Sequence, residues 1–308
     1  LWEAIEAGQY PEWEFGIQVV PEEDEHKYDF DLLDPTKLIP EELVPVEIIG
    51  KMTLNKNPEN FFAETEQVAF LPGHIIPGID FTNDPLLQGR LFSYRDTQLS
   101  RLGSPNFHQI PINRSVVPHH NNQRDGHMQT EIPKGQTAYF PNSLSMGCPH
   151  LAKMAEGGYS HHQERIDAHK IRGRSASFSD HYSQPALFYR SLSSWEQQHV
   201  ADAYTFELGK CNHKHIQERI LWIINQIDQE LAKKVADGLG LTVPKKIDEP
   251  VNQAIGADAD IEKFQPNSKK QYLDKDASLS QANTKFDSIA TRQIAFLAAD
   301  QFDMKRFE

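Results

Sequence analysis

The chain has 308 residues, of which 38% are hydrophobic and 24% are charged, a balance typical of a globular protein. Its formal net charge of −13 at pH 7 argues against nucleic acid and anionic membranes as partners, since both carry negative charge. No uninterrupted apolar run approaches the roughly 20 residues that a membrane-spanning helix needs.

The first part of the chain is predicted to contain short helices and strands. Residues 1–9 fit a short helix, and alternating polar and apolar residues predict strands at 13–20 and 46–54. A longer helix is expected from Pro58 to Gln67, because proline is well tolerated in the first turn of a helix. The prolines and glycines of residues 71–85 then predict an ordered loop that leads into a further helix.

The second part of the chain differs in composition. Between 103 and 190, Pro, Asn, His, Ser and Gly dominate and hydrophobic periodicity is weak, so a long loop is expected. Residues 193–237 are predicted to be helical, with Gly238 or Gly240 ending the last helix. The apolar stripe of this region consists of Ile220, Ile223, Ile224, Ile227, Leu231 and Val235. Residues 244–288 are rich in Pro, Asp and Ser and are interpreted as a linker.

Both ends of the chain have the character of internal segments. The chain opens with LWEAIEAGQYPEWEF, which lacks an initiator methionine, a basic region and an apolar signal segment. At the other end, residues 289–308 contain a predicted buried strand at 293–299 and then stop. We therefore expect this sequence to be part of a longer chain.

The stretch GRLFSYRDTQLSRLG, residues 89–103, carries the most specific chemical signal. As a helix, it places Arg90, Tyr94 and Arg101 on nearly the same face, at about 100° per residue. A tyrosine phenol titrates near pH ~10, so it becomes an anionic metal ligand at neutral pH only where a neighbour stabilises the phenolate. Arg90, one turn away, can do so, and a phenolate oxygen suits ferric iron. The structural alternative is an ordinary amphipathic helix with both arginines solvated.

This stretch resembles the proximal haem motif of monofunctional haem catalases, and it is one of several such strings. Upstream are GKMTLNKNPENFFAETEQVAF (50–70) and LPGHIIPGIDFTNDPLLQGRLFSYRDT (71–97). Downstream are RLGSPNFHQIPINR (101–114) and NNQRDG (121–126), and a weaker similarity continues through 178–210. The strings and the long tail are more similar to large-subunit catalases than to small-subunit ones.

The resemblance implies an α+β fold that contains part of the catalase antiparallel β-barrel, a long wrapping loop and a C-terminal helical domain. It also implies a homotetramer, because the wrapping loop of the family embraces neighbouring subunits. The expected divisions are 1–102 for half of the barrel with the proximal haem helix, 103–190 for the wrapping loop, 191–243 for the helical domain, 244–288 for the linker and 289–308 for the start of a flavodoxin-like domain.

The resemblance further implies haem-dependent dismutation of hydrogen peroxide to water and oxygen, with haem b or its modified form haem d. Tyr94 would be the axial ligand of the iron, Arg90 would keep it ionised, and Arg101 would pair with a haem propionate. The distal histidine and asparagine that move the peroxide proton in the family are expected to precede residue 1. No catalytic residue is therefore assigned within this chain, and the fragment alone is expected to be inactive.

Two other functions fit the same residues. The chain could be a catalase remnant that binds haem without turning over peroxide. It could also be a non-enzymatic scaffold whose long loop and acidic helices bind partners, in which case it would take up no haem.

Two positions depart from related catalases. Small-subunit members hold a nicotinamide dinucleotide through a Val-Trp-Pro-His string, whereas residues 38–41 here are Leu-Ile-Pro-Glu and Glu42 adds a charge that repels phosphate. No bound NADPH is therefore expected.

Some large-subunit members link the axial tyrosine to a histidine three residues before the PGH histidine. Here that position is Leu71, with His74 as the PGH histidine, so the cross-link should be absent.

Other candidate sites carry weaker signals. The clusters His119-His120, His161-His162 and Cys211-x-His213-x-His215 lack the spacing of zinc sites and are interpreted as polar surface residues. Cys148 and Cys211 could pair, but a chain of this length does not depend on one disulfide. Asn113 opens a glycosylation sequon and is expected to be unmodified, because a glycan there would clash with the haem-adjacent segment.

Overall fold

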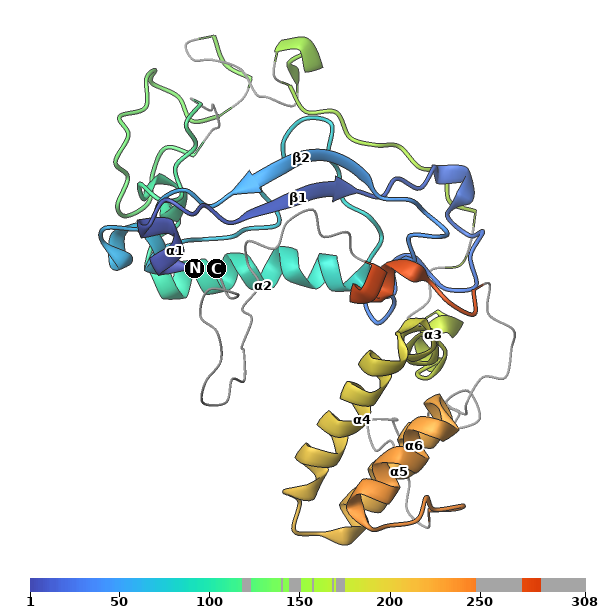
Figure 1. Cartoon of the computed structure of the whole chain (residues 1–308). Coiled ribbons are helices and arrows are strands. Elements are labelled where there is room, and N and C mark those ends of the chain that lie inside the picture. Colours follow the sequence, from blue (N-terminus) through green and yellow to red (C-terminus); the bar gives the residue numbers. More distant parts are fainter. Residues whose placement is uncertain are drawn as a thin grey trace, which may run out of the picture. The chain divides into compact units, whose positions relative to one another are not determined.

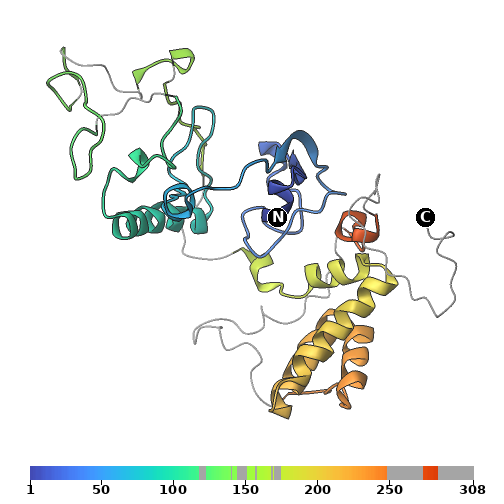
Figure 2. The ribbon, with the colours of Figure 1, turned by 60° about the vertical axis from the view of Figure 1, so that its left-hand side comes forward.

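The computed structural model describes residues 1–117, 123–139, 141–143, 151–156, 158–167, 169, 175–247 and 273–283 (Figures 1 and 2). These residues belong to two compact units. The first comprises Leu1–Leu38 and Val46–Phe178, and the second comprises Ile39–Pro45 and the residues from Ser179 onward. Among the described residues, no helix is both long and apolar enough to cross a membrane.

The first unit contains a two-stranded antiparallel sheet formed by β1 (Glu12–Ile17) and β2 (Glu47–Thr53) (Figure 1). Both strands were predicted from the alternation of polar and apolar residues. The Glu12 carboxylate holds the register at one end, because it pairs with Lys51 Nζ at 2.8 Å and accepts a hydrogen bond from Thr53 Oγ1 at 3.2 Å. This is the only sheet in the described part of the chain. The structure is therefore of mixed α and β content.

The register of the sheet shifts between Phe15 and Gly16. A Cβ atom on Gly16 would lie 2.4 Å from Val46 Cγ1, so only glycine allows the two strands to approach this closely. The short helix expected at the start of the chain is α1 (Trp2–Glu6). It is attached to the end of β2 through Asn57 Nδ2, which donates to the carbonyl of Trp2 at 3.0 Å.

The helix predicted from Pro58 to Gln67 is wrong in length. The structure has a single π-helical turn there, η2 (Phe62–Glu66). Asn60 sets its start, because Asn60 Oδ1 accepts from the backbone of Ala63 at 3.0 Å. The Glu64 carboxylate also accepts from the backbone of Asn60 at 2.8 Å, so the residues before Phe62 are held in a turn.

The predicted tyrosine-bearing helix is confirmed as α2 (Pro85–Leu102) (Figure 1). Asp84 caps its N-terminus by accepting from the backbone of Leu86 at 2.8 Å, and Pro85 occupies the first turn. Gly103 ends the helix in the left-handed conformation with φ of 73°, and its N–H donates to the carbonyl of Leu99. Both ends of α2 are therefore determined by its own sequence.

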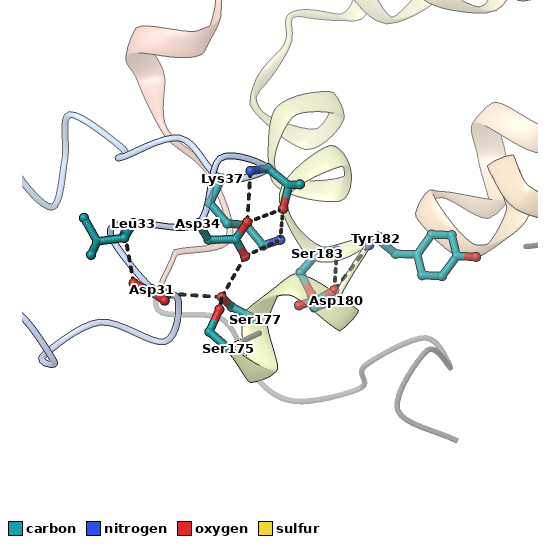
Figure 3. A network of polar contacts seen from close by, with 10 residues as sticks. Asp31, Leu33, Asp34, Lys37, Ser175, Ser177, Asp180, Tyr182 and Ser183 are labelled. Atoms are coloured by element: carbon teal, nitrogen blue, oxygen red, sulfur yellow. Dashed lines mark hydrogen bonds and ion pairs between the residues drawn. The ribbon is translucent and has the colours of Figure 1, made fainter. Parts of the chain in front are cut away.

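A buried polar network attaches residues 175–177 to the loop at 31–37 within the first unit (Figure 3). Ser177 Oγ donates to Asp34 at 2.9 Å and accepts from the backbone of Asp31 at 3.2 Å. Lys37 Nζ lies 3.5 Å from the Asp34 carboxylate, and both side chains are almost fully buried. Burial acts to raise the pKa of Asp34, but hydrogen bonds from Thr36 and Ser177 outweigh it and the pKa is lowered. The carboxylate is thus held in its charged form.

The second unit is helical. It contains α3 (Ser183–Ser191), α4 (Ser194–Gly209), α5 (Lys214–Ile227) and α6 (Gln229–Leu239). The backbone of Tyr182 and that of Ser183 both donate to Asp180 Oδ1 at the start of α3 (Figure 3). Helix α6 packs against both α4 and α5 (Figure 1).

The helical region predicted at 193–237 is confirmed, but it is divided into three helices. Asp228 interrupts it in an extended conformation and caps α6 by accepting from the backbone of Leu231 at 3.0 Å. Gly240 ends α6 in the left-handed conformation, as one of the two predicted glycines. The core consists of Tyr189, Ala201, Leu208, Leu221, Ile224, Leu231, Ala232, Val235 and Ala236.

The described residues 273–283 are bound to the helical unit. Glu196, in the first turn of α4, accepts from Ser280 Oγ at 2.6 Å and from the backbone of Gln281 at 2.9 Å. The same carboxylate accepts from the backbone of Ser193 at 2.8 Å, which completes a capping box. These bonds, that from Ser280 foremost, lower the pKa of Glu196 to about 2 despite its burial.

Asp276 provides a second attachment for the same segment. Its side chain is fully buried and accepts from Ser278 Oγ at 2.6 Å, while its backbone N–H donates to Ser191 Oγ at 2.8 Å. The sequence placed residues 244–288 in a linker, and 273–283 is the described part of its second half. Residues 248–272 and 284–308, with the predicted strand at 293–299, lie outside the described residues.

Leu221→Ala is expected to lower the free energy of unfolding of the helical unit by about 2–5 kcal/mol, because Leu221 is fully buried in its core. Chemical denaturation followed by circular dichroism measures this loss. Ile216→Ala on the same helix is the matched control, since Ile216 is 38% exposed. Equal losses for the two variants would contradict the packing of α5 described above.

The pKa of Glu196 also predicts a pH dependence. Because this pKa is about 2 in the folded protein and its ordinary value is 4.5, the stabilisation is present above the higher value and is lost as pH falls toward the lower one. Acid unfolding of Glu196→Gln should therefore be less pH-dependent between these two values than that of the unmodified protein. The same pH dependence of unfolding in Glu196→Gln and in the unmodified protein would show that Glu196 does not anchor residues 273–283.

Candidate functional site

The predicted tyrosine and arginine residues lie on α2. The guanidinium carbon of Arg90 is 5.1 Å from the centroid of the Tyr94 ring. Tyr94 is half-buried, whereas Arg90 and Arg101 are exposed. A cation at this distance from an aromatic face is attracted to it, so the charge of Arg90 is held beside the phenol.

The Tyr94 hydroxyl is chemically available. Within the part of the chain that the structure describes, it makes no hydrogen bond, and the contact with Arg90 is to the ring face. A tyrosine oxygen without other partners can be offered to a metal ion, and oxygen donors of this kind suit ferric iron.

Arg101 makes contacts that the sequence did not indicate. Its Nη2 donates to the carbonyl of Val68 at 2.6 Å and to Gln98 Oε1 at 2.7 Å, and its Nη1 donates to the carbonyl of Glu66 at 3.1 Å. A guanidinium binds a carboxylate in a fork through either Nε and Nη2 or Nη1 and Nη2. Both forks need Nη2, and the two Nη2 protons of Arg101 are already donated to Val68 and Gln98. Arg101 thus keeps Nε–H and one Nη1–H for further acceptors, which allows single hydrogen bonds to a carboxylate instead of a fork.

Side chains donate most of the hydrogen bonds that the carbonyls of residues 66–70 accept, whereas the N–H of Val68 donates to the carbonyl of Thr65. Gln98 Nε2 donates to the carbonyl of Phe70 at 3.2 Å. Asn113 Oδ1 accepts from the N–H of Ala69 at 2.7 Å, and Asn113 Nδ2 donates to the carbonyl of Gln67 at 2.9 Å. Three side chains thus bond the carbonyls of Glu66, Gln67, Val68 and Phe70 and the N–H of Ala69. The sequence analysis did not identify Gln98 or Asn113 in this role.

A pocket of about 620 Å³ lies beside α2. Its lining includes Leu71, His74, Arg95, Leu99, Phe107 and His108. The His74 ring stacks on that of Phe107, with centroids 6.0 Å apart and an interplanar angle of 15°. Tyr94 is not among the lining residues, so this pocket and the Arg90–Tyr94 pair occupy different faces of the helix.

The His161-His162 cluster has a local structural role. Asp80 accepts from the backbone of His162 at 2.8 Å and from the Tyr159 hydroxyl at 2.9 Å, and His161 Nδ1 lies 2.7 Å from it. Backbone N–H groups, that of His162 foremost and then that of Phe81, lower the pKa of Asp80 to about 2. The cluster anchors residues 159–162 to the loop that precedes α2.

The remaining candidates form no metal site in the described residues, where no group of three or more His, Cys, Asp or Glu side chains could hold an ion. The His213 and His215 rings are 5.7 Å apart near the half-buried Cys211 thiol. His119, His120 and Cys148 lie outside the described residues. At the sequon, Asn113 Nδ2 already donates to two carbonyls, so a glycan on that atom would disturb both bonds.

Comparisons with known proteins agree with the motifs. The family model described as Catalase matches residues 1–146, and that described as Catalase-related immune-responsive matches residues 175–239. A Catalase HPII of Pseudomonas putida is 65% identical over 248 residues, which cover 80% of this chain and 35% of that protein. Catalase-2 of Bacillus subtilis is 52% identical over 308 residues, which cover 100% of this chain and 42% of that protein. The chain thus spans about two fifths or less of the length of these relatives.

Asp80→Ala is expected to accelerate limited proteolysis within residues 158–164, because three contacts that anchor this segment are lost together. Mass spectrometry of the early fragments locates the cleavage. Asp167→Ala, which removes an exposed carboxylate a few residues farther along the chain, is the matched control. Unchanged cleavage in Asp80→Ala would contradict the anchoring role.

Proposed function

Because this chain belongs to the catalase family and is most similar there to large-subunit members, we propose that it supplies the proximal haem side of an enzyme that converts hydrogen peroxide to water and oxygen. One observation carries the proposal beyond family membership. The Tyr94 hydroxyl makes no hydrogen bond in the described structure, while the cation of Arg90 lies over its ring. This is the environment that an anionic iron ligand needs.

Three residues would hold the haem. The Tyr94 oxygen would ligate the iron, and Arg90 would maintain the phenolate by its positive charge. Arg101 would donate Nε–H or its remaining Nη1–H to a propionate, since its other N–H groups are engaged by Glu66, Val68 and Gln98. A bound haem, either b or d, supplies the redox chemistry of peroxide dismutation.

The residues of this chain act on that chemistry through charge and position. A ligand with negative charge donates electron density to the iron, and Arg90 limits this donation because it attracts the same charge. We assign no residue within the described part of the chain to proton transfer at the peroxide. That step requires a group on the opposite side of the haem from Tyr94.

The larger architecture is also part of the proposal. Strands β1 and β2 would belong to a closed antiparallel barrel, because large apolar side chains on them are exposed: Trp13, Phe15, Ile48, Ile49 and Met52 are 43–58% exposed. Residues 103–190 would wrap a neighbouring subunit of a homotetramer. The wrapping role is supported by the scarcity of helices and strands between residue 103 and α3 among the described residues.

Tyr94→Phe should remove the tyrosinate bands from the absorption spectrum of the haem-loaded protein, because the substitution deletes the ligand oxygen. In a full-length chain that also carries the expected distal residues, it should abolish peroxide decay. Oxygen evolution and absorption spectroscopy measure the two effects. Tyr10→Phe is the matched control, since Tyr10 is 50% exposed.

The outcomes separate the three functions considered above. Haem bound through Tyr94 together with peroxide decay supports the enzyme. Haem bound through Tyr94 without peroxide decay by the full-length chain indicates a haem-binding remnant, and a folded protein without haem uptake indicates a scaffold. Full turnover in Tyr94→Phe would refute the assigned ligand.

A further inference from the structure

We propose that Asn113 is a positioning residue that sets the orientation of the Arg101 guanidinium through the backbone of residues 66–70. The inference rests on the proposed function, in which Arg101 binds a haem propionate. Asn113 itself has no contact with Arg90, Tyr94 or Arg101 among the described hydrogen bonds, so its action on the site is indirect.

The two side chains bind alternate residues of the same segment. Arg101 donates to the carbonyls of Glu66 and Val68, and Asn113 binds the carbonyl of Gln67 and the N–H of Ala69. A displacement of Gln67 and Ala69 would therefore also displace the neighbouring carbonyls of Glu66 and Val68. Because these carbonyls are two of the three acceptors of Arg101, the guanidinium would move with them.

Asn113 also connects residues 66–70 to the short helix that follows α2. Its Nδ2 donates to the carbonyl of Phe107 at 3.1 Å, in the short helix η3 (Phe107–Gln109) that contacts α2. The three bonds use both amide protons and the acceptor oxygen of one side chain. The amide thus bridges the segment before the 71–84 loop and the segment after α2.

The positioning matters because Arg101 is exposed. A long exposed side chain populates several rotamers and loses entropy when one is imposed. The carbonyls of Glu66 and Val68 and the buried Gln98 select one arrangement, which directs the remaining Nε–H and Nη1–H. Without a fixed segment, two of these three restraints weaken, and the propionate contact should weaken with them.

The test compares haem release from the purified holoprotein to excess apomyoglobin. Asn113→Asp replaces the amide donor by a carboxylate that faces two carbonyl oxygens, and Asn113→Ala removes the contacts without adding a charge. We expect release to accelerate about fivefold, the equivalent of one hydrogen bond, while the tyrosinate bands of Tyr94 remain. Asn142→Asp is the matched control, because Asn142 Nδ2 also donates to a backbone carbonyl, that of Tyr139, but has no described hydrogen bond to residues 66–70.

A double-mutant cycle with Arg101→Ala tests the route of the effect. If Asn113 acts through Arg101, the double variant should release haem no faster than Arg101→Ala alone. Additive effects would overturn the proposal, because a merely structural role of Asn113 would not depend on Arg101. If Arg101→Ala itself leaves release unchanged, the propionate role of Arg101 fails. If it accelerates release but neither Asn113 variant does, only the positioning role fails.

Hydrogen exchange in the unmodified protein gives a measurement that does not depend on variants. The Ala69 amide, which donates to Asn113 Oδ1 at 2.7 Å, should be protected to an extent comparable with amides inside α2. Exchange at the rate of an unstructured peptide would show that Asn113 does not hold the segment, and the proposal would be withdrawn.

Discussion

Residues 66–70 form a backbone segment without a strand partner among the described residues, and side chains bond most of its carbonyls. Backbone polar groups outside a sheet depend on whichever side chains reach them. Here Gln98 and Arg101 reach it from α2 and Asn113 reaches it from the following loop. The arrangement joins three sequence regions around the tyrosine helix. It also engages most of the N–H donors of Arg101 within the protein itself.

The helix α2 is the rigid element of the site. Asp84 and Pro85 determine where it begins and Gly103 determines where it ends, so the spacing of Arg90 and Tyr94 along it is set by helical geometry alone. The two arginines of this face nevertheless have different roles. Arg90 contacts the Tyr94 ring, whereas Arg101 is bonded to backbone carbonyls and to Gln98. Sequence spacing alone does not distinguish these environments.

The helical unit is stabilised in a different way. Its centre is apolar, with Leu221, Ile224 and Val235 almost fully buried. Its attachment to residues 273–283 instead relies on the buried carboxylate of Glu196, which accepts from Ser280 and Gln281, and on the Asp276 N–H, which donates to Ser191 Oγ. Such bonds favour the ionised form, which explains why Glu196 is buried and yet has a lowered pKa.

The sequence by itself determined what depends on neighbours along the chain. The strands β1 and β2, the caps of α2, and the placement of Arg90 and Tyr94 on one helix face follow from local periodicity and capping. The predicted stripe of α5 and α6 was only partly right, because Ile224, Leu231 and Val235 are buried but so is Leu221, which it omitted. The motifs also determined the family, because several specific strings occur in order. The turn at Asn60 and the cap at Asp228 are local features that the sequence analysis did not identify. The tertiary structure decided what depends on residues distant in sequence. Gln98 and Asn113 bonded residues 66–70, and the carbonyls of Glu66 and Val68 engaged Arg101 from more than 30 residues away. These outcomes arise from hydrogen-bond acceptors whose positions are known only once the chain is folded, and no repeat along the sequence encodes them.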